Sequence, residues 1–155
     1  GQLPFHYSQK GINFKKGYLF LEEGPLYPFG FGLSYTDFEY SDLVLSAEEI
    51  SDSEDLIVTV QVSNKGAIEA KEVVQLYIKD IIGSVLRPAK ELKSFKKISL
   101  KPGETKTVQF TLNAGMLAFT GINMESVIEA GTYEVMVGTS SATCLKSQFK
   151  LKTDL

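Results

Sequence analysis

Several residue types that build catalytic and metal sites are scarce in this chain of 155 residues. It has one cysteine, Cys144, so neither an internal disulfide nor a cysteine-rich zinc cluster can be assembled. His6 is the only histidine, and no Gly-x-Ser-x-Gly turn is present to carry a nucleophilic serine. Tryptophan is absent and Arg87 is the only arginine. The sequence therefore predicts neither a metal site nor a cofactor.

Charge and hydropathy argue against two classes of partner. The 16 basic and 19 acidic residues are well mixed and give a net charge of −3, whereas a nucleic-acid surface needs a basic stripe. The densest group of lysines, between Lys90 and Lys101, is interleaved with Leu92 and Phe95 and is typical of the solvated side of a strand. No apolar run approaches the roughly 20 residues of a membrane-spanning helix. We expect no nucleic-acid partner and no membrane partner.

From residue 56 onward, apolar and polar residues alternate with the period of two that predicts strands buried on one face. The alternating runs are Val58–Val62, Val74–Ile78, Val108–Leu112, Tyr133–Val137 and Leu145–Leu151. Two less regular strands are expected near residues 38–45 and 92–100, the first with a bulge at Ser41-Asp42. Lys101-Pro102-Gly103-Glu104 predicts a type II turn, and Asn64-Lys65-Gly66 a turn with left-handed residues. About seven strands and no long helix predict an all-β sandwich of two packed sheets.

The first forty residues differ from the rest in composition. They hold six of the ten Phe and five of the seven Tyr, but they lack periodicity and are interrupted by glycine and proline. Such a segment cannot bury its aromatic rings in a core of its own, so it must lie along another surface. Residues 1–36 are therefore interpreted as an irregular N-terminal arm, and residues 37–155 as the sandwich. The chain begins without an initiator methionine, and we expect it to be a fragment of a longer protein.

A distinctive motif, Pro28-Phe29-Gly30-Phe31-Gly32-Leu33-Ser34-Tyr35, lies within this arm. Other blocks accompany it in a fixed order, namely Gly1–Pro4, Gly17–Phe20, Ala70–Tyr77, Arg87–Phe95 and Leu100–Thr105. Taken together, they resemble the end of family 3 glycoside hydrolases, where a second domain leads into a C-terminal domain of fibronectin type III-like, immunoglobulin-like fold. The resemblance covers nearly the whole chain.

The resemblance implies a non-catalytic structural domain. Members of the family are retaining β-glucosidases or β-xylosidases whose nucleophile and acid/base residue lie upstream, and no position of this sequence matches either. The implied partners are the upstream catalytic domains of the same chain. The residues expected to pack against those domains are Tyr27, Pro28, Phe29, Phe31, Tyr35 and Arg87. The isolated fragment could also self-associate through the arm to cover Phe5, Phe14 and Phe20. The alternative function is that of a carbohydrate-binding or adhesive sandwich. The sequence leaves the compartment open, and a periplasmic or secreted parent protein is compatible with it.

Two carboxylates and the single arginine were weighed as candidates for chemistry. Glu72 and Glu91 lie in family-like blocks, and their sequence neighbours Lys71 and Lys90 are expected to lower their pKa values. A lowered pKa is the opposite of what a glycosidase acid needs, which favours structural pairing. Arg87 precedes a proline in a predicted loop, where it could either hold a carboxylate through both nitrogens or remain solvated.

Overall fold

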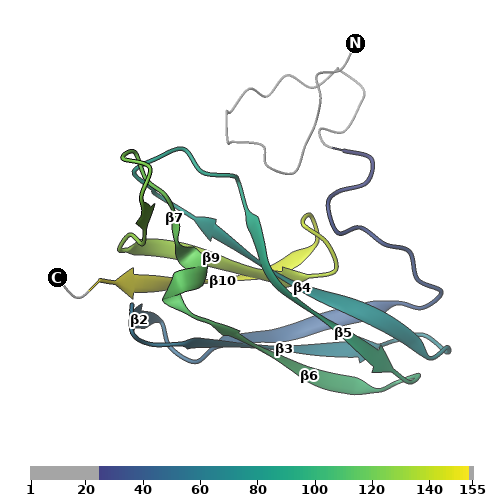
Figure 1. Cartoon of the computed structure of the whole chain (residues 1–155). Helices are drawn as coiled ribbons and strands as arrows, with labels where there is room; N and C mark the ends of the chain where they lie inside the picture. Colours follow the sequence, from purple (N-terminus) through teal and green to yellow (C-terminus); the bar gives the residue numbers. More distant parts are fainter. Residues whose placement is uncertain (1–24, 154–155) are drawn as a thin grey trace, which may run out of the picture.

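The alternating runs of the sequence form strands in two facing layers (Figure 1). This computed structural model describes residues 25–153. The strands are β1 (Phe38–Leu45), β2 (Glu49–Ser51), β3 (Leu56–Asn64), β4 (Ala70–Asp80), β5 (Glu91–Leu100), β6 (Thr105–Leu112), β7 (Phe119–Thr120), β8 (Ser126–Val127), β9 (Gly131–Gly138) and β10 (Cys144–Lys152). A short 3-10 helix, Ala114–Leu117, connects β6 to β7.

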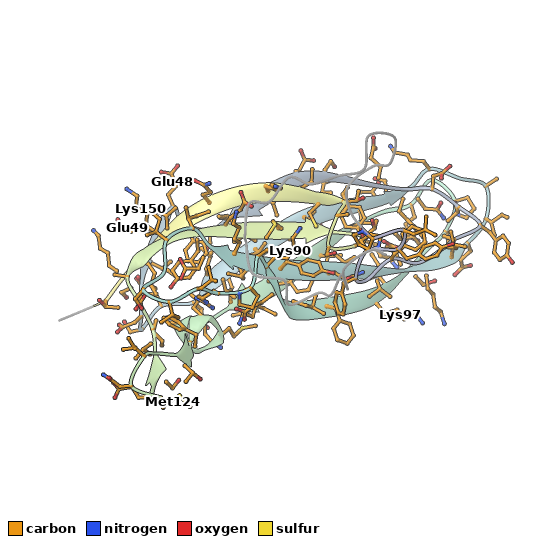
Figure 2. The ribbon with its side chains drawn as sticks, turned by 90° about the horizontal axis from the view of Figure 1, so that it is seen from above. Glu48, Glu49, Lys90, Lys97, Met124 and Lys150 are labelled. Carbon is orange, nitrogen blue, oxygen red and sulfur yellow. The ribbon has the colours of Figure 1, made fainter. Side chains whose placement is uncertain are left out.

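One layer is a three-stranded sheet in the order β1-β3-β6, and the other is a five-stranded sheet in the order β2-β10-β9-β4-β5. All pairings are antiparallel except that of the short β2 with β10, where Lys150 lies opposite Glu49. Figure 2 shows Glu48, Glu49 and Lys150 together at that sheet edge. The predicted sandwich is confirmed, and its seven predicted strands are the seven long ones; β2 and the β7–β8 hairpin are additional.

The core lies between the two sheets and consists of the inward positions of the alternating runs. Six apolar residues of the predicted alternating runs are at most 2% exposed, as the alternation predicts: Val60, Val74, Leu76, Phe110, Val135 and Phe149. The rings of Tyr133 and Phe149 stack with centroids 5.6 Å apart, which fills the core between β9 and β10. The outward residues Gln109 and Gln148 are exposed, as the same alternation predicts.

Strand irregularities and turns follow the local sequence with one exception. The register shifts between Ser41 and Val44, and Asp42 has φ +51°, which confirms the predicted bulge. The type II turn is also confirmed, because Gly103 has φ +73° and Glu104 N–H donates to Lys101 O at 3.0 Å. The left-handed turn predicted at residues 64–66 is wrong, since none of these residues has positive φ.

The Asn64 side chain explains this exception. Asn64 is fully buried, and its Nδ2 donates to Ile68 O at 2.8 Å and to Leu100 O at 3.0 Å. Its Oδ1 accepts from Gly66 N–H at 3.1 Å. The Asn64 side chain therefore fixes the conformation of the loop by hydrogen bonding, and no residue of the loop has to adopt a left-handed conformation.

The outer face of the five-stranded sheet is partly covered, which alternation alone does not predict. Tyr77 on β4 and Met136 on β9 lie opposite each other at outward positions, yet both are at most 1% exposed. In Figure 1 the β4–β5 loop, residues 81–90, and the segment 25–36 both rise on this side of the sandwich. Within residues 25–153, no helix is long and apolar enough to span a membrane. Four residues named in the sequence analysis lie outside the described residues, namely Phe5, His6, Phe14 and Phe20. The expectations for them therefore stay predictions.

Candidate domain-docking surface

The aromatic motif begins with a tight turn on the outer face of the five-stranded sheet. Phe31 N–H donates to Pro28 O at 3.0 Å, and Gly30 has φ +79°. A Cβ on Gly30 would stand 2.0 Å from Gln75 Oε1, so only glycine fits both the backbone angle and the space. Gly32 has no such role, because a Cβ there would meet nothing within 4 Å and its φ is not positive.

Hydrogen bonds fasten this turn to the sheet through its backbone carbonyl groups. Gln75 Nε2 donates to Gly30 O at 3.0 Å and also to Thr139 O at 2.6 Å. Ser141 N–H, in the β9–β10 turn, donates to Phe29 O at 2.8 Å. Tyr77 Oη donates to Gln75 Oε1, which fixes the orientation of the buried amide. The turn is thus held at a defined position by groups that have no freedom to reorient.

The aromatic rings divide into one that faces the sheet and others that face solvent. Phe29 meets Tyr77 edge-on, with centroids 6.5 Å apart, whereas Tyr27 packs against Phe31 at 5.2 Å. Phe29 and Phe31 are about half exposed, Tyr27 is 67% exposed and Tyr35 is 96% exposed. A fixed backbone that presents large exposed rings is typical of a surface that another protein layer covers.

An open groove of about 660 Å³ separates the segment 29–38 from the outer face of β4 and β5. Its apolar lining comprises Phe29, Phe31, Leu33, Phe38, Val73, Leu92 and Phe95. Its polar lining includes Asp37, Lys71, Glu72 and Gln75. Phe95 differs from the other aromatic side chains of the strands in being 64% exposed. Phe95 lies opposite Gln75 in a register that runs unbroken from Leu100, so it shares the outer face with Gln75.

Glu72 is one of the residues that line the groove, and the expectation that its pKa is lowered is wrong. Burial raises the pKa of Glu72, against smaller opposing effects from a hydrogen bond with Tyr40 and one with the Val73 backbone. Tyr40 Oη on β1 donates to Glu72 Oε1 at 2.8 Å, a contact that joins the two sheets. Lys71 does not lower this pKa because consecutive side chains of a strand point to opposite faces.

Glu91 does have a lowered pKa, although not because of Lys90. Burial alone would raise the pKa of Glu91, but its hydrogen bond and ion pair with Lys93 and its contact with Arg87 together lower it. Lys93 Nζ lies 2.6 Å from Glu91 Oε2. Lys90 instead donates to Ser141 O across the outer face, where Figure 2 shows it over the middle of the sheet.

Arg87 is the centre of a buried ion network rather than a solvated loop residue. Its Nη1 lies 3.1 Å from Asp80 Oδ2 and its Nη2 lies 3.1 Å from Glu91 Oε1. Its guanidinium also lies over the ring of Phe119, 4.6 Å from the centroid. Only 8% of the Arg87 side chain is exposed, which leaves little of it for a carboxylate outside this domain. The arginine joins two carboxylates of its own domain, so its predicted packing against another domain remains a prediction.

The structure brings five of the six predicted packing residues together. One turn on the sheet contains four of them, Tyr27, Pro28, Phe29 and Phe31, and Tyr35 projects from the same segment. Arg87 lies apart, in the β4–β5 loop. Three residues that fasten the segment or its neighbouring turn could not be identified from the sequence, namely Gln75, Ser141 and Lys90. Gln75 resembles any outward polar residue of an alternating strand, so no local signal distinguishes it. The described residues contain no cluster of three His, Cys, Asp or Glu side chains that could hold a metal.

Comparisons with known proteins identify the type of domain. Residues 72–141 match the model of the fibronectin type III-like domain. A Formosa agariphila protein with a provisional β-xylosidase name is 59% identical over 98% of this chain, and the periplasmic β-glucosidase of Salmonella typhimurium is 38% identical over 97%. The solved structure of a β-glucosidase from Erythrobacter marinus superposes on 97% of the chain with a TM-score of 0.89 and 37% identity. The chain spans only about a fifth of the length of each of these three proteins (20%, 21% and 20%).

Proposed function

This chain carries the fibronectin type III-like domain of the family 3 glycoside hydrolases, and from that premise we propose that it packs on the catalytic domains of its parent chain and holds them in place. The parent is proposed to be a β-glucosidase or β-xylosidase, since the relatives bear those names. The domain is C-terminal to the catalytic domains and non-catalytic, and the sugar is bound and cleaved upstream of it.

The observation that carries the proposal is the docked aromatic segment. Its backbone is fixed by Gln75 and Ser141, while Tyr27, Phe31 and Tyr35 present exposed rings. A segment fixed in this way on one side and apolar on the other acts as a rigid connection between two domains. We place the domain boundary after residue 36, because β1 begins at Phe38. The same rings support self-association of the isolated chain, where the catalytic domains do not cover them.

The carboxylates of Glu72 and Glu91 are arranged for structural pairing. A retaining glycosidase needs two carboxyl groups about 5–5.5 Å apart, one acting as nucleophile and one as acid. Glu72 accepts a hydrogen bond from a phenol, and Glu91 is engaged by Arg87 and Lys93. These partners occupy the carboxylate oxygens that such chemistry would need.

An activity assay and a stability measurement test the proposal together. The purified chain should show no turnover of chromogenic β-glucosides or β-xylosides, and turnover that disappears when one of its carboxylates is changed would refute the proposal. In the parent enzyme, Tyr35→Ser should lower the unfolding temperature by about 2–4 °C. The same substitution should leave the unfolding of the isolated chain unchanged, because Tyr35 is almost fully exposed there.

A carbohydrate-binding module is the second candidate, favoured by one observation. The exposed Phe95 ring lies beside an open groove, and sugars stack on exposed aromatic faces. Retention of the chain on immobilised glucan or xylan, lost in Phe95→Ala and kept in Val44→Ala, would support this function over the structural one.

A further inference from the structure

We propose that one end of the sandwich forms a second, aliphatic contact with the same catalytic domains, separate from the aromatic segment. This end, here called the aliphatic tip, consists of loop 81–90 and the β7–β8 hairpin, residues 119–127. The inference rests on the proposed function and specifies its interface: the catalytic domains are held at two points, and the partner surface at the tip is apolar and uncharged.

The aliphatic tip exposes large apolar side chains from both of its segments. Ile82 is 84% exposed and Leu86 is 58% exposed in the loop, while Ile122 and Met124 in the hairpin are 87% and 84% exposed. Residues 81–86 contain no charged side chain, and Glu125 is the only one in the hairpin. Isolated exposed apolar residues are common, but four of them on two neighbouring loops with few charged side chains indicate a contact surface.

A buried ion pair and a set of exposed hydrogen bonds hold the two segments of the tip together. Arg87 bonds to Asp80 and Glu91 at the two ends of the loop and lies over Phe119, which begins the hairpin. Ser84 N–H and Oγ both donate to the Glu129 carboxylate, which follows the hairpin, the first at 3.0 Å. Because these bonds fix the loops before any partner binds, association costs little further ordering.

The backbone at Met124 supports a role in contact rather than in folding. Met124 has φ +63°, a left-handed angle that glycine or asparagine adopts with less strain. Gly121 N–H donates to Glu125 O at 2.9 Å and Met124 N–H donates to Gly121 O at 3.1 Å, which closes the turn. Figure 2 shows Met124 at the outermost point of this end. A strained residue that presents an apolar side chain to solvent marks a functional position.

The position of the tip identifies the catalytic domains as its partner. In Figure 1 the β7 hairpin and the segment 25–36 stand at opposite ends of the same side of the sandwich, above the five-stranded sheet. A single body that rests on the aromatic segment and crosses the outer face would reach the tip. The relatives supply a body of sufficient size, because this domain accounts for only about a fifth of their length (20% and 21%).

The test compares the full-length parent enzyme with the isolated chain. Ile82→Ser/Ile122→Ser should lower the unfolding temperature of the parent by about 2–4 °C and leave that of the isolated chain unchanged. Val44→Ser/Ile68→Ser is the matched control, since both residues are more than half exposed elsewhere and should change neither protein. Met124→Asn sharpens the test, because it should stabilise the isolated chain by relieving strain while destabilising the parent.

Three results would overturn the inference. The first is an unchanged unfolding temperature of the parent carrying Ile82→Ser/Ile122→Ser. The second is an equal change of unfolding temperature in the parent and in the isolated chain. The third is a tip variant whose only effect is to dissociate a dimer of the parent, as seen by sedimentation. Tyr35→Ser separates this inference from the proposed function. A parent sensitive to Tyr35→Ser but not to the tip variant refutes the second contact alone, whereas insensitivity to both refutes the packing role itself.

Discussion

The middle of strand β4 is buried on both faces of the five-stranded sheet, but by different means. On the inner face, Val74 and Leu76 of β4 pack against the apolar residues of the opposite sheet. On the outer face, Gln75 and Tyr77 of the same strand are equally inaccessible, and polar bonds to segment 25–36 and to the β9–β10 turn cover them. The inner face is thus held by non-directional packing, which determines the fold. The outer face is held by directional hydrogen bonds, which position the connection to another domain.

The inner face should show the largest effects on stability. Phe149→Ala or Phe110→Ala should lower the free energy of unfolding by about 3–5 kcal/mol, because each leaves a cavity among fully packed neighbours. Gln148→Ala and Gln109→Ala, one residue away on the exposed face, should change it by less than about 0.5 kcal/mol. Urea unfolding of the four variants measures this difference. Equal losses for the Phe and Gln variants would mean that the strand faces are wrongly assigned.

The ion network of Arg87 should show the next largest effect. Arg87→Leu leaves the Asp80 carboxylate buried without its partner, and should cost about 3 kcal/mol. The double variant Arg87→Leu/Asp80→Leu removes the unpaired charge and should recover part of that loss. Chemical unfolding of the single and double variants gives the coupling energy between the two residues. A double variant as unstable as the sum of the two single variants would show that the residues act independently.

The docked turn should show a smaller, local effect. Gly30→Ala should cost about 1–2 kcal/mol, because the residue has positive φ and its Cβ would overlap Gln75. The amides of Phe31 and Ser141, which donate within or to this turn, should then exchange faster with solvent. Gly32→Ala is the matched control, since its Cβ meets no neighbouring atom. Unchanged exchange in Gly30→Ala would contradict the fixed position of the turn.

The burial of Glu72 should show the smallest effect on stability, with a defined pH dependence. Burial raises the pKa of Glu72, so the folded chain holds this proton more tightly than the unfolded chain does. The stability contributed by this group is therefore present at acidic pH and is lost as the pH rises through the folded pKa, above 4.5. As the pH rises through this range, the Glu72→Gln variant should lose less free energy of unfolding than the unmodified chain. The difference between the two losses should be below about 1 kcal/mol. Thermal unfolding at pH 4 to 7 measures the difference, and parallel profiles would contradict the assignment.

The fold could be read largely from the sequence because its cause is local. Alternation at Val58–Val62 or Val108–Leu112 identifies a half-buried strand, and Pro102-Gly103 selects a type II turn without reference to distant residues. The bulge at Asp42 was also predictable, since the apolar positions on its two sides are out of phase. For the aromatic segment, composition predicted only that its rings must pack on a surface outside the segment itself.

What the sequence alone determined about this protein is its two-layer β-architecture and the existence of an aromatic segment unable to form its own core. Only the tertiary structure decided which groups fasten that segment, because Gln75 and Ser141 meet it from positions 45 and 112 residues away from the carbonyls they bind. The tertiary structure also reversed the expected pKa of Glu72 and buried Arg87. Burial and distant partners set these properties, and neither is encoded in the residues next to them in the chain.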